Sequence, residues 1–289
     1  MTTIAAAPAA TLRPASSVVR RPSAVSAWAT LAKRRIALSA RTPREVLAPL
    51  ATPILFALVI APALAKMIPT AGRGGPDYRT FVITGTVGLL IPLTCAFAGI
   101  GVIVDRTSGA RRELLAAPIP RAAIVAGNLA VALLTSALQI TVLLLAGLAR
   151  GATFDITATG FGWFVLSALA FTSFAYSLAE ILANRLPTQE EYIGLTPVVA
   201  IVPWFLAGSL FPVTAMPVGL AWIARFLPTT HVLALVRYGL LDRHATGLHA
   251  IWGVSSNTGA AALSLLVLGA WAALLGLLSV KVFARAASS

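Results

Sequence analysis

The chain has 289 residues, of which 58% are hydrophobic and 11% are charged, and its mean hydropathy is +0.89. A soluble domain is about one quarter charged, so this composition excludes an ordinary soluble protein and favours an integral membrane protein. The formal net charge of +13 does not indicate a nucleic-acid partner, because the basic residues flank apolar runs and form no basic domain with interleaved aromatics.

The N-terminal region predicts two different segments. Residues 1–26 are rich in Ala, Ser, Thr and Pro, which is typical of a disordered cytoplasmic tail, so the transmembrane domain is expected over residues 27–289. Directly after the tail, apolar residues alternate with basic ones. This pattern favours an amphipathic helix in the membrane interface, and a simple basic flank of the first span is the alternative. The residues assigned to this helix are Trp28, Arg34, Arg35, Arg41 and Pro43.

Six apolar runs follow, each close to the roughly 20 residues that a spanning helix needs. The expected fold class is therefore an all-α integral membrane protein with six transmembrane helices. Six spans place both termini on one side, which carries 15 Lys and Arg residues against 7 on the other side. The positive-inside rule then places both termini in the cytoplasm and the chain in the cell membrane. The runs lie at about 46–66, 80–104, 122–149, 160–182, 193–211 and 258–283.

A charged stretch separates the second and third runs. It predicts a short cytoplasmic helix that ends before Pro118. Ala110, Leu114 and Ala117 recur at helical spacing and predict an apolar face on this helix. From composition alone, a basic helix lying on lipid is favoured. Burial of the apolar face against a partner protein, with Arg111 and Arg112 pointing elsewhere to meet acidic groups of that partner, is the alternative. The charged residues of the stretch are Asp105, Arg106, Arg111, Arg112 and Glu113.

The stretch between the last two runs, about 212–257, is too broken by Pro and Gly to be one span and too apolar for a solvated loop. Two short helices that re-enter the outer leaflet are expected there. An interfacial hairpin, with Trp222, Tyr238 and Trp252 at headgroup level, is the alternative.

The sequence lacks the motifs of an enzyme. It contains no G-x-x-x-x-G-K-[ST], no G-x-S-x-G and no H-E-x-x-H, so no catalytic, cofactor or metal site is expected on this chain. An ion-coupled carrier needs ionisable residues at membrane depth. Glu180 is the one carboxylate within an apolar run, near its cytoplasmic end, where a structural pairing with Arg185 or with the N-terminal helix is expected. Transport would then need energy from another protein.

The charged stretch resembles the loop signature of the ABC-2 type permeases, the membrane subunits of ATP-binding-cassette exporters. Asp105 and Arg106 match its first positions conservatively, and Arg112 stands where the family usually has an acidic residue, with Glu113 one place later. A second block resembles the family segment after the fifth span, and Arg41 and Pro43 resemble its connecting helix. The residues that match outright are Gly109, Leu114, Leu115 and Pro118 in the first block, and Gly208, Phe211, Pro212, Pro217, Pro228, Thr230 and Arg237 in the second.

This resemblance implies a dimer of permeases, identical or homologous, with two separate ATPase subunits that hold ATP and Mg²⁺. The helix at about 107–117 would dock in a groove of the ATPase, and cargo would pass between the two permeases. Drug-resistance and antibiotic-export permeases of the daunorubicin type are the most similar subfamily, which implies export of a hydrophobic or amphipathic compound. A glycolipid or polysaccharide is the alternative cargo, and an ion-coupled secondary carrier is a more distant one.

Overall fold

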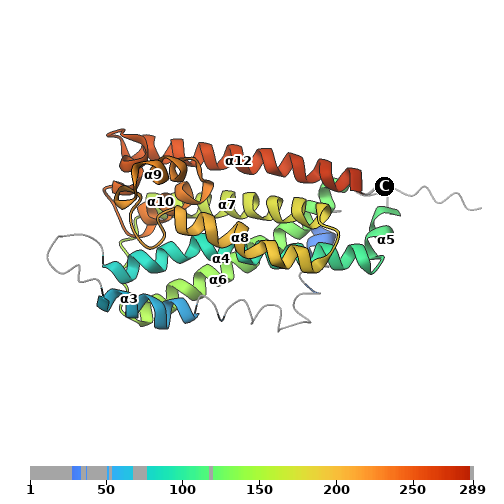
Figure 1. Cartoon of the computed structure of the whole chain (residues 1–289), viewed down its shortest axis with the longest axis horizontal. Helices are drawn as coiled ribbons and strands as arrows, with labels where there is room; N and C mark the ends of the chain where they lie inside the picture. The colour runs from blue at the N-terminus through green and yellow to red at the C-terminus, as the bar shows by residue number, and fades with distance from the viewer. Residues whose placement is uncertain are drawn as a thin grey trace, which may run out of the picture.

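A computed structural model describes residues 28–33, 37, 51, 54–67, 77–116 and 120–286, and these residues form helices without any strand. The all-α class is therefore confirmed for the described part of the chain (Figure 1). The elements are η1 (Phe56–Ile60), α3 (Ala61–Met67), α4 (Tyr78–Thr107), α5 (Ala110–Ala116), α6 (Arg121–Ala149), α7 (Ala158–Arg185), α8 (Gln189–Leu206), η2 (Val213–Ala215), α9 (Val218–Phe226), α10 (Pro228–Leu240), α11 (Thr246–Trp252) and α12 (Asn257–Ala286).

Four of the described helices, α4, α6, α7 and α12, are long and apolar enough to cross a membrane. The pair α9 and α10, bent by 84°, would make a fifth if it forms one broken span. The other two predicted spans are shorter: the apolar helix of the first run is described over Phe56–Lys66, and α8 begins with Gln189, Glu190 and Glu191. The six-span layout therefore stays a prediction.

The long helices run side by side along the long axis of the molecule, and α5 lies at one end (Figure 1). Helix α7 is central, because it packs against α12, α4, α10 and α6. Its fully buried aromatic residues Phe171 and Tyr176 belong to the main apolar core, together with Ile83 of α4 and Leu143 of α6. The core thus holds the bundle together along most of its length.

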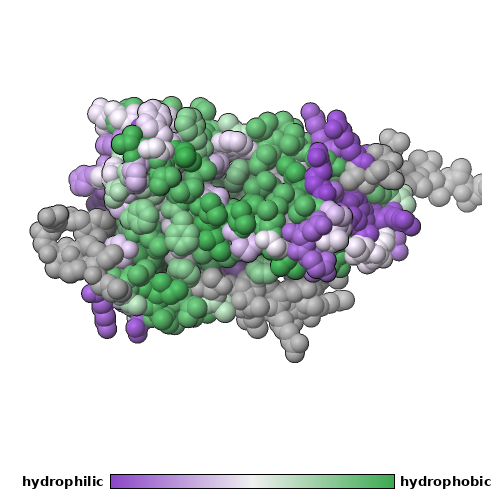
Figure 2. All heavy atoms as spheres, viewed as in Figure 1, coloured by the Kyte–Doolittle hydropathy of each residue, from purple (hydrophilic) through white to green (hydrophobic). Residues whose placement is uncertain are grey.

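The outer surface of the bundle is apolar along its middle, and hydrophilic residues gather at the end that carries α5 (Figure 2). Leu145 of α6 is 60% exposed, and Leu266 and Leu277 of α12 are each 68% exposed. Exposure of so large an apolar surface to water is energetically unfavourable, whereas its contact with lipid chains is favourable. The surface thus agrees with the composition in indicating a membrane protein.

Helices α9 and α10 lie at the end opposite α5 (Figure 1), and α11 packs there against α10 and α12. Two short helices, α9 and α10, form where two were expected, and a third, α11, follows them. Helix α10 is buried along nearly its whole length, and it packs against α7, α12 and α4. Burial against protein is the condition under which broken helices are tolerated at membrane depth. Re-entry into the membrane remains a prediction.

Candidate functional site

Helix α5 is separated from α4 and α6 by residues that break helices. Gly109 follows the last turn of α4 with φ of +82°, a left-handed conformation that glycine adopts without steric cost. Pro120 has φ −59° and ψ 130° and precedes the first residue of α6, where its missing N–H leaves no hydrogen bond unmade. The seven-residue helix between them is therefore a distinct element at the polar end of the bundle. Pro118, expected to end this helix, lies outside the described residues.

Arg111 of α5 points into the chain, so the expectation that it meets a partner is wrong. Its Nη1 donates to Oδ1 of Asn184 at 3.0 Å, and its Nη2 donates to the carbonyl oxygen of Phe283 at 3.2 Å. The guanidinium also lies 4.6 Å from the centre of the Phe283 ring, and only 7% of the residue is exposed. Burial lowers the pKa of Arg111, while the Glu180 carboxylate opposes that shift. Arg111 therefore joins α5 to α7 and α12.

Glu180 extends this connection into the bundle. It is fully buried, the Tyr176 hydroxyl donates to its Oε2, and Asn184 Nδ2 donates to its Oε1 at 3.0 Å. Asn184 thus bridges Glu180 and Arg111, donating to the first and accepting from the second. The result is a polar network from α5 to the interior of α7, in which Glu180 takes part. The N-terminal partners considered for it, Arg34 and Arg35, lie outside the described residues.

Two further arginines bind backbone carbonyls at the same end. Arg106, at the end of α4, donates to the carbonyl oxygens of Ala183, Leu186 and Pro187 at 3.0–3.1 Å. Arg121, the first residue of α6, donates to the carbonyl oxygen of Ala284 at 2.9 Å. Because the last carbonyls of a helix have no partner within it and carry partial negative charge, these arginines stabilise the ends of α7 and α12. Asp105, which directly precedes Arg106 in the sequence, is half-buried.

The apolar side of α5 also packs against other parts of the same chain. Leu114 and Leu115 are half-buried and pack against the main core, so this face is partly covered within the chain, and its burial against a partner stays a prediction. The exposed residues of α5 are Arg112, Glu113 and Ala116. A docking protein would therefore meet this polar face, which contains both signs of charge. Ala117, the third residue of the expected apolar face, lies outside the described residues.

At the opposite end, Arg237 of the second sequence block makes contacts with several other parts of the chain. Its two Nη atoms donate to the carbonyl oxygens of Gly208 and Ser209, each at 2.9 Å, and its guanidinium lies 3.6 Å from the centre of the Phe81 ring. Gly208 has φ of +78°. These contacts join α10 to the turn after α8.

The other residues of the second block lie in or near the short helices. Pro212 precedes η2, Pro217 precedes α9, and Pro228 begins α10. Thr230 is buried, and Phe211 is 45% exposed.

Sequence reasoning missed two contacts that fix α8 and the turn after it against α4. Trp204 Nε1 donates to the carbonyl oxygen of Gly85 at 2.8 Å, and the Tyr78 hydroxyl donates to that of Leu210 at 2.9 Å. A single aromatic residue in an apolar run gives no sign of such a role. Each contact joins residues more than 100 positions apart, so no local pattern could have revealed it.

Of the residues assigned to the N-terminal interfacial helix, Trp28 is described. Its Nε1 donates to the carbonyl oxygen of Ala126 at 3.1 Å, and 41% of the residue is exposed. Leu31 packs against the main core. Residues 28–33 are thus helical and lie against the first turns of α6. Arg34, Arg35, Arg41 and Pro43 lie outside the described residues, so an interfacial position of this helix is still a prediction.

The bundle of long apolar helices, its lipid-compatible surface and the short polar helix between α4 and α6 define an α-helical membrane protein. Residues 26–241 match the ABC-2 type transporter family, and the chain belongs to this family. The resemblance inferred from the sequence motifs is thereby confirmed. This family supplies the membrane subunits of ATP-binding-cassette transporters, and membership implies an ABC ATPase as partner.

Curated relatives cover most of the chain. It is 26% identical over 233 residues to nodulation protein J of Rhizobium leguminosarum bv. trifolii, an alignment that covers 76% of this chain and 84% of the relative. Nodulation protein J of Sinorhizobium fredii is 28% identical over 71% of this chain and 77% of its own length. The inner membrane transport permease YadH of Escherichia coli is 24% identical over 71% of this chain and 79% of its own length.

Proposed function

We propose that the chain is the permease subunit of an ATP-driven exporter and that the exposed face of α5 receives a separate ATPase subunit. The observation that carries this proposal is the structure of α5, which exposes Arg112, Glu113 and Ala116 while Arg111 fixes it to α7 and α12. A surface that is exposed and also firmly connected to the bundle suits the transfer of motion from one subunit to another. A helix that only rests on lipid needs no such internal connection.

The proposed topology has six spans, with the α5 end in the cytoplasm. The first and fifth spans would be the run that ends in α3 and the run that forms α8. Consistent with this layout, Lys66 at the end of α3 and Arg79 at the start of α4 line the same cavity at the end opposite α5. The distribution of Lys and Arg over the whole sequence, 15 against 7, favours a cytoplasmic position for both termini.

The proposed cargo is a hydrophobic or amphipathic compound that passes between this permease and a second one, identical or homologous. Helix α8 offers a suitable surface, because it exposes an apolar face that no described part of the chain covers. Two ATPase subunits would supply the energy, holding ATP and Mg²⁺ between them. The apolar residues of this face are Ile193, Val198, Val202 and Phe205, each between 46% and 55% exposed.

Reconstitution in proteoliposomes tests this function. The chain and its cognate ATPase should move a fluorescent amphiphile when ATP is present, and neither subunit should do so alone. Transport driven by an ion gradient, without ATP or the ATPase, would contradict the proposal and indicate a secondary carrier. Glu180→Gln separates the two cases, because it should leave ATP-driven transport per folded molecule within about twofold, whereas it removes the proton or ion relay that a carrier needs.

A further inference from the structure

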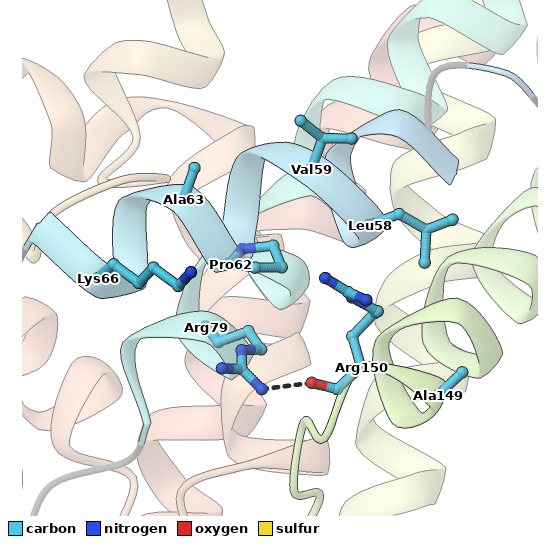
Figure 3. A pocket seen from close by; sticks show the side chains of 8 residues that line it. All are labelled: Leu58, Val59, Pro62, Ala63, Lys66, Arg79, Ala149 and Arg150. Atoms are coloured by element: carbon cyan, nitrogen blue, oxygen red, sulfur yellow. Dashed lines mark hydrogen bonds between the residues drawn. The ribbon is translucent and has the colours of Figure 1, made fainter.

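A cavity of about 500 Å³ lies at the end of the bundle opposite α5. Its walls come from η1 and α3, from the first turn of α4 and from the last turn of α6 (Figure 3). Three basic residues, Lys66, Arg79 and Arg150, line it together with the apolar residues Leu58, Val59 and Pro62, and no carboxylate is among its described lining residues. We refer to it as the basic cavity.

The three cationic groups come from α3, from α4 and from the turn that follows α6, and they turn toward the same space (Figure 3). Cations that share one site repel one another, so their approach is unfavourable unless an anion joins them. The carboxylate nearest in sequence, Asp77, accepts a hydrogen bond from the backbone N–H of Arg79 at the start of α4. The basic cavity therefore has excess positive charge and favours an anionic ligand.

Contacts within the fold hold the Arg79 side chain in its position. Its Nη1 donates to the carbonyl oxygen of Arg150, which follows the last residue of α6. Gly151 has φ of +80°, and a Cβ on it would lie 3.1 Å from that same Nη1 atom. The Nε of Arg79 is buried and has no hydrogen-bond partner among the described residues. The glycine thus leaves room for a guanidinium that retains unused hydrogen-bonding capacity.

The other wall of the basic cavity is apolar and open. Leu58, Val59 and Pro62 lie on η1 and α3, and Val59 is 55% exposed. Lys66 lies in the last turn of this short apolar helix, where a long side chain can carry its charge toward the headgroup level. A ligand that fits both walls has an anionic head and an apolar tail.

We propose that the basic cavity binds an anionic phospholipid of the membrane, with the phosphate among Lys66, Arg79 and Arg150 and the start of an acyl chain against Leu58, Val59 and Pro62. The site lies where α3 ends and α4 begins, which is the membrane–water boundary in the proposed topology. A phosphodiester at that boundary is available continuously, and its chains enter the adjacent lipid. The proposal does not depend on which cargo is exported or on the ATPase.

The test is binding of dioctanoyl phosphatidylglycerol to the purified chain in detergent, measured by native mass spectrometry, with dioctanoyl phosphatidylcholine as the zwitterionic reference. Lys66→Gln and Arg150→Gln are suitable variants, because both residues are exposed and the described contact of Arg150 at this site uses its backbone oxygen. Each substitution should weaken binding of the anionic lipid about fivefold, and the double variant about 25-fold. Arg243→Gln, an exposed cation at the same end but outside the cavity, is the matched control.

Equal weakening by Arg243→Gln would overturn the proposal, because binding would then follow net charge alone. Unchanged binding in the double variant would also overturn it. Glycerophosphate, which has no acyl chains, separates a lipid from a soluble anion: the proposal expects it to bind far more weakly than the lipid, and equal binding would contradict the role of the apolar wall. None of these outcomes depends on transport, so the lipid site and the exporter function are tested independently of each other.

Discussion

Several arginines in this protein bind backbone carbonyl groups of the chain itself. Arg106, Arg111, Arg121 and Arg237 each donate to one or more carbonyl oxygens at a helix end or a turn. Such carbonyls have no partner in the helix and would otherwise be left unsatisfied next to an apolar bundle. Part of the net positive charge is therefore used in stabilising the fold. The cations that remain free to meet other molecules are fewer than the sequence suggests.

Two adjacent arginines of α5 give a matched test at this scale. Arg111→Gln removes hydrogen bonds to Asn184 and Phe283 from a buried position, so it should lower the free energy of unfolding by about 2 kcal/mol. Arg112→Gln makes the same chemical change at an exposed position and should change that value by less than about 0.5 kcal/mol. Thermal unfolding of both variants in one detergent measures the difference. Equal Tm values for the two variants would contradict the buried position of Arg111.

At the scale of elements, close helix packing depends on small residues at specific contacts. Helices α7 and α10 approach each other at Gly160 and Gly239, where a Cβ on Gly239 would lie 2.5 Å from the carbonyl oxygen of Gly160. Backbones come this close in membrane bundles where a side chain is absent. Because α10 also packs against α12 and α4, the contact helps to hold the end of the bundle opposite α5 in place.

Gly239→Ala tests this contact. The added methyl group would also lie 2.8 Å from Cβ of Phe164, so the variant should lose about 1–3 kcal/mol of stability through overpacking. Gly162→Ala is the control in the same helix as Gly160, because nothing lies within 4 Å of its Cβ. That substitution should leave stability unchanged or raise it by about 0.5 kcal/mol through higher helix propensity. Comparing the two Tm values decides the matter, and equal losses would refute the close contact.

The long helices were predictable from the sequence, whereas the orientation of α5 was not. The run predicted at 122–149 is α6, Arg121–Ala149, and the run predicted at 258–283 is α12, Asn257–Ala286, because apolar length determines such helices. In α5, periodicity selected Leu114 for a partner, but α5 is a helix of seven residues packed against its own chain. Arg111 faces inward because Asn184 and Phe283, distant in sequence, supply its partners. Local patterns contain no information on such contacts.

At the scale of the whole molecule, the two ends of the bundle differ in structure. The end with α5 exposes a short polar helix that is fixed to α7 and α12, and the opposite end carries α9, α10 (Figure 1) and the short helix α11 that packs against α10. A docked ATPase that displaces α5 would act directly on α7 and α12 through Arg111 and Asn184. Since α7 lies at the centre of the bundle, motion at α5 has a short route to the remaining helices.

The docking role of α5 is tested most directly by the affinity of the purified permease for its cognate ATPase. Arg112→Glu combined with Ala116→Glu alters the exposed face of α5 without touching its buried contacts, and it should weaken binding about 30-fold or more, as expected for substitutions central to an interface. Lys281→Glu, an exposed residue of α12 at the same end, should leave the affinity nearly unchanged because salt screens distant charges. Undiminished binding of the double variant, with its Tm intact, would show that the ATPase docks elsewhere.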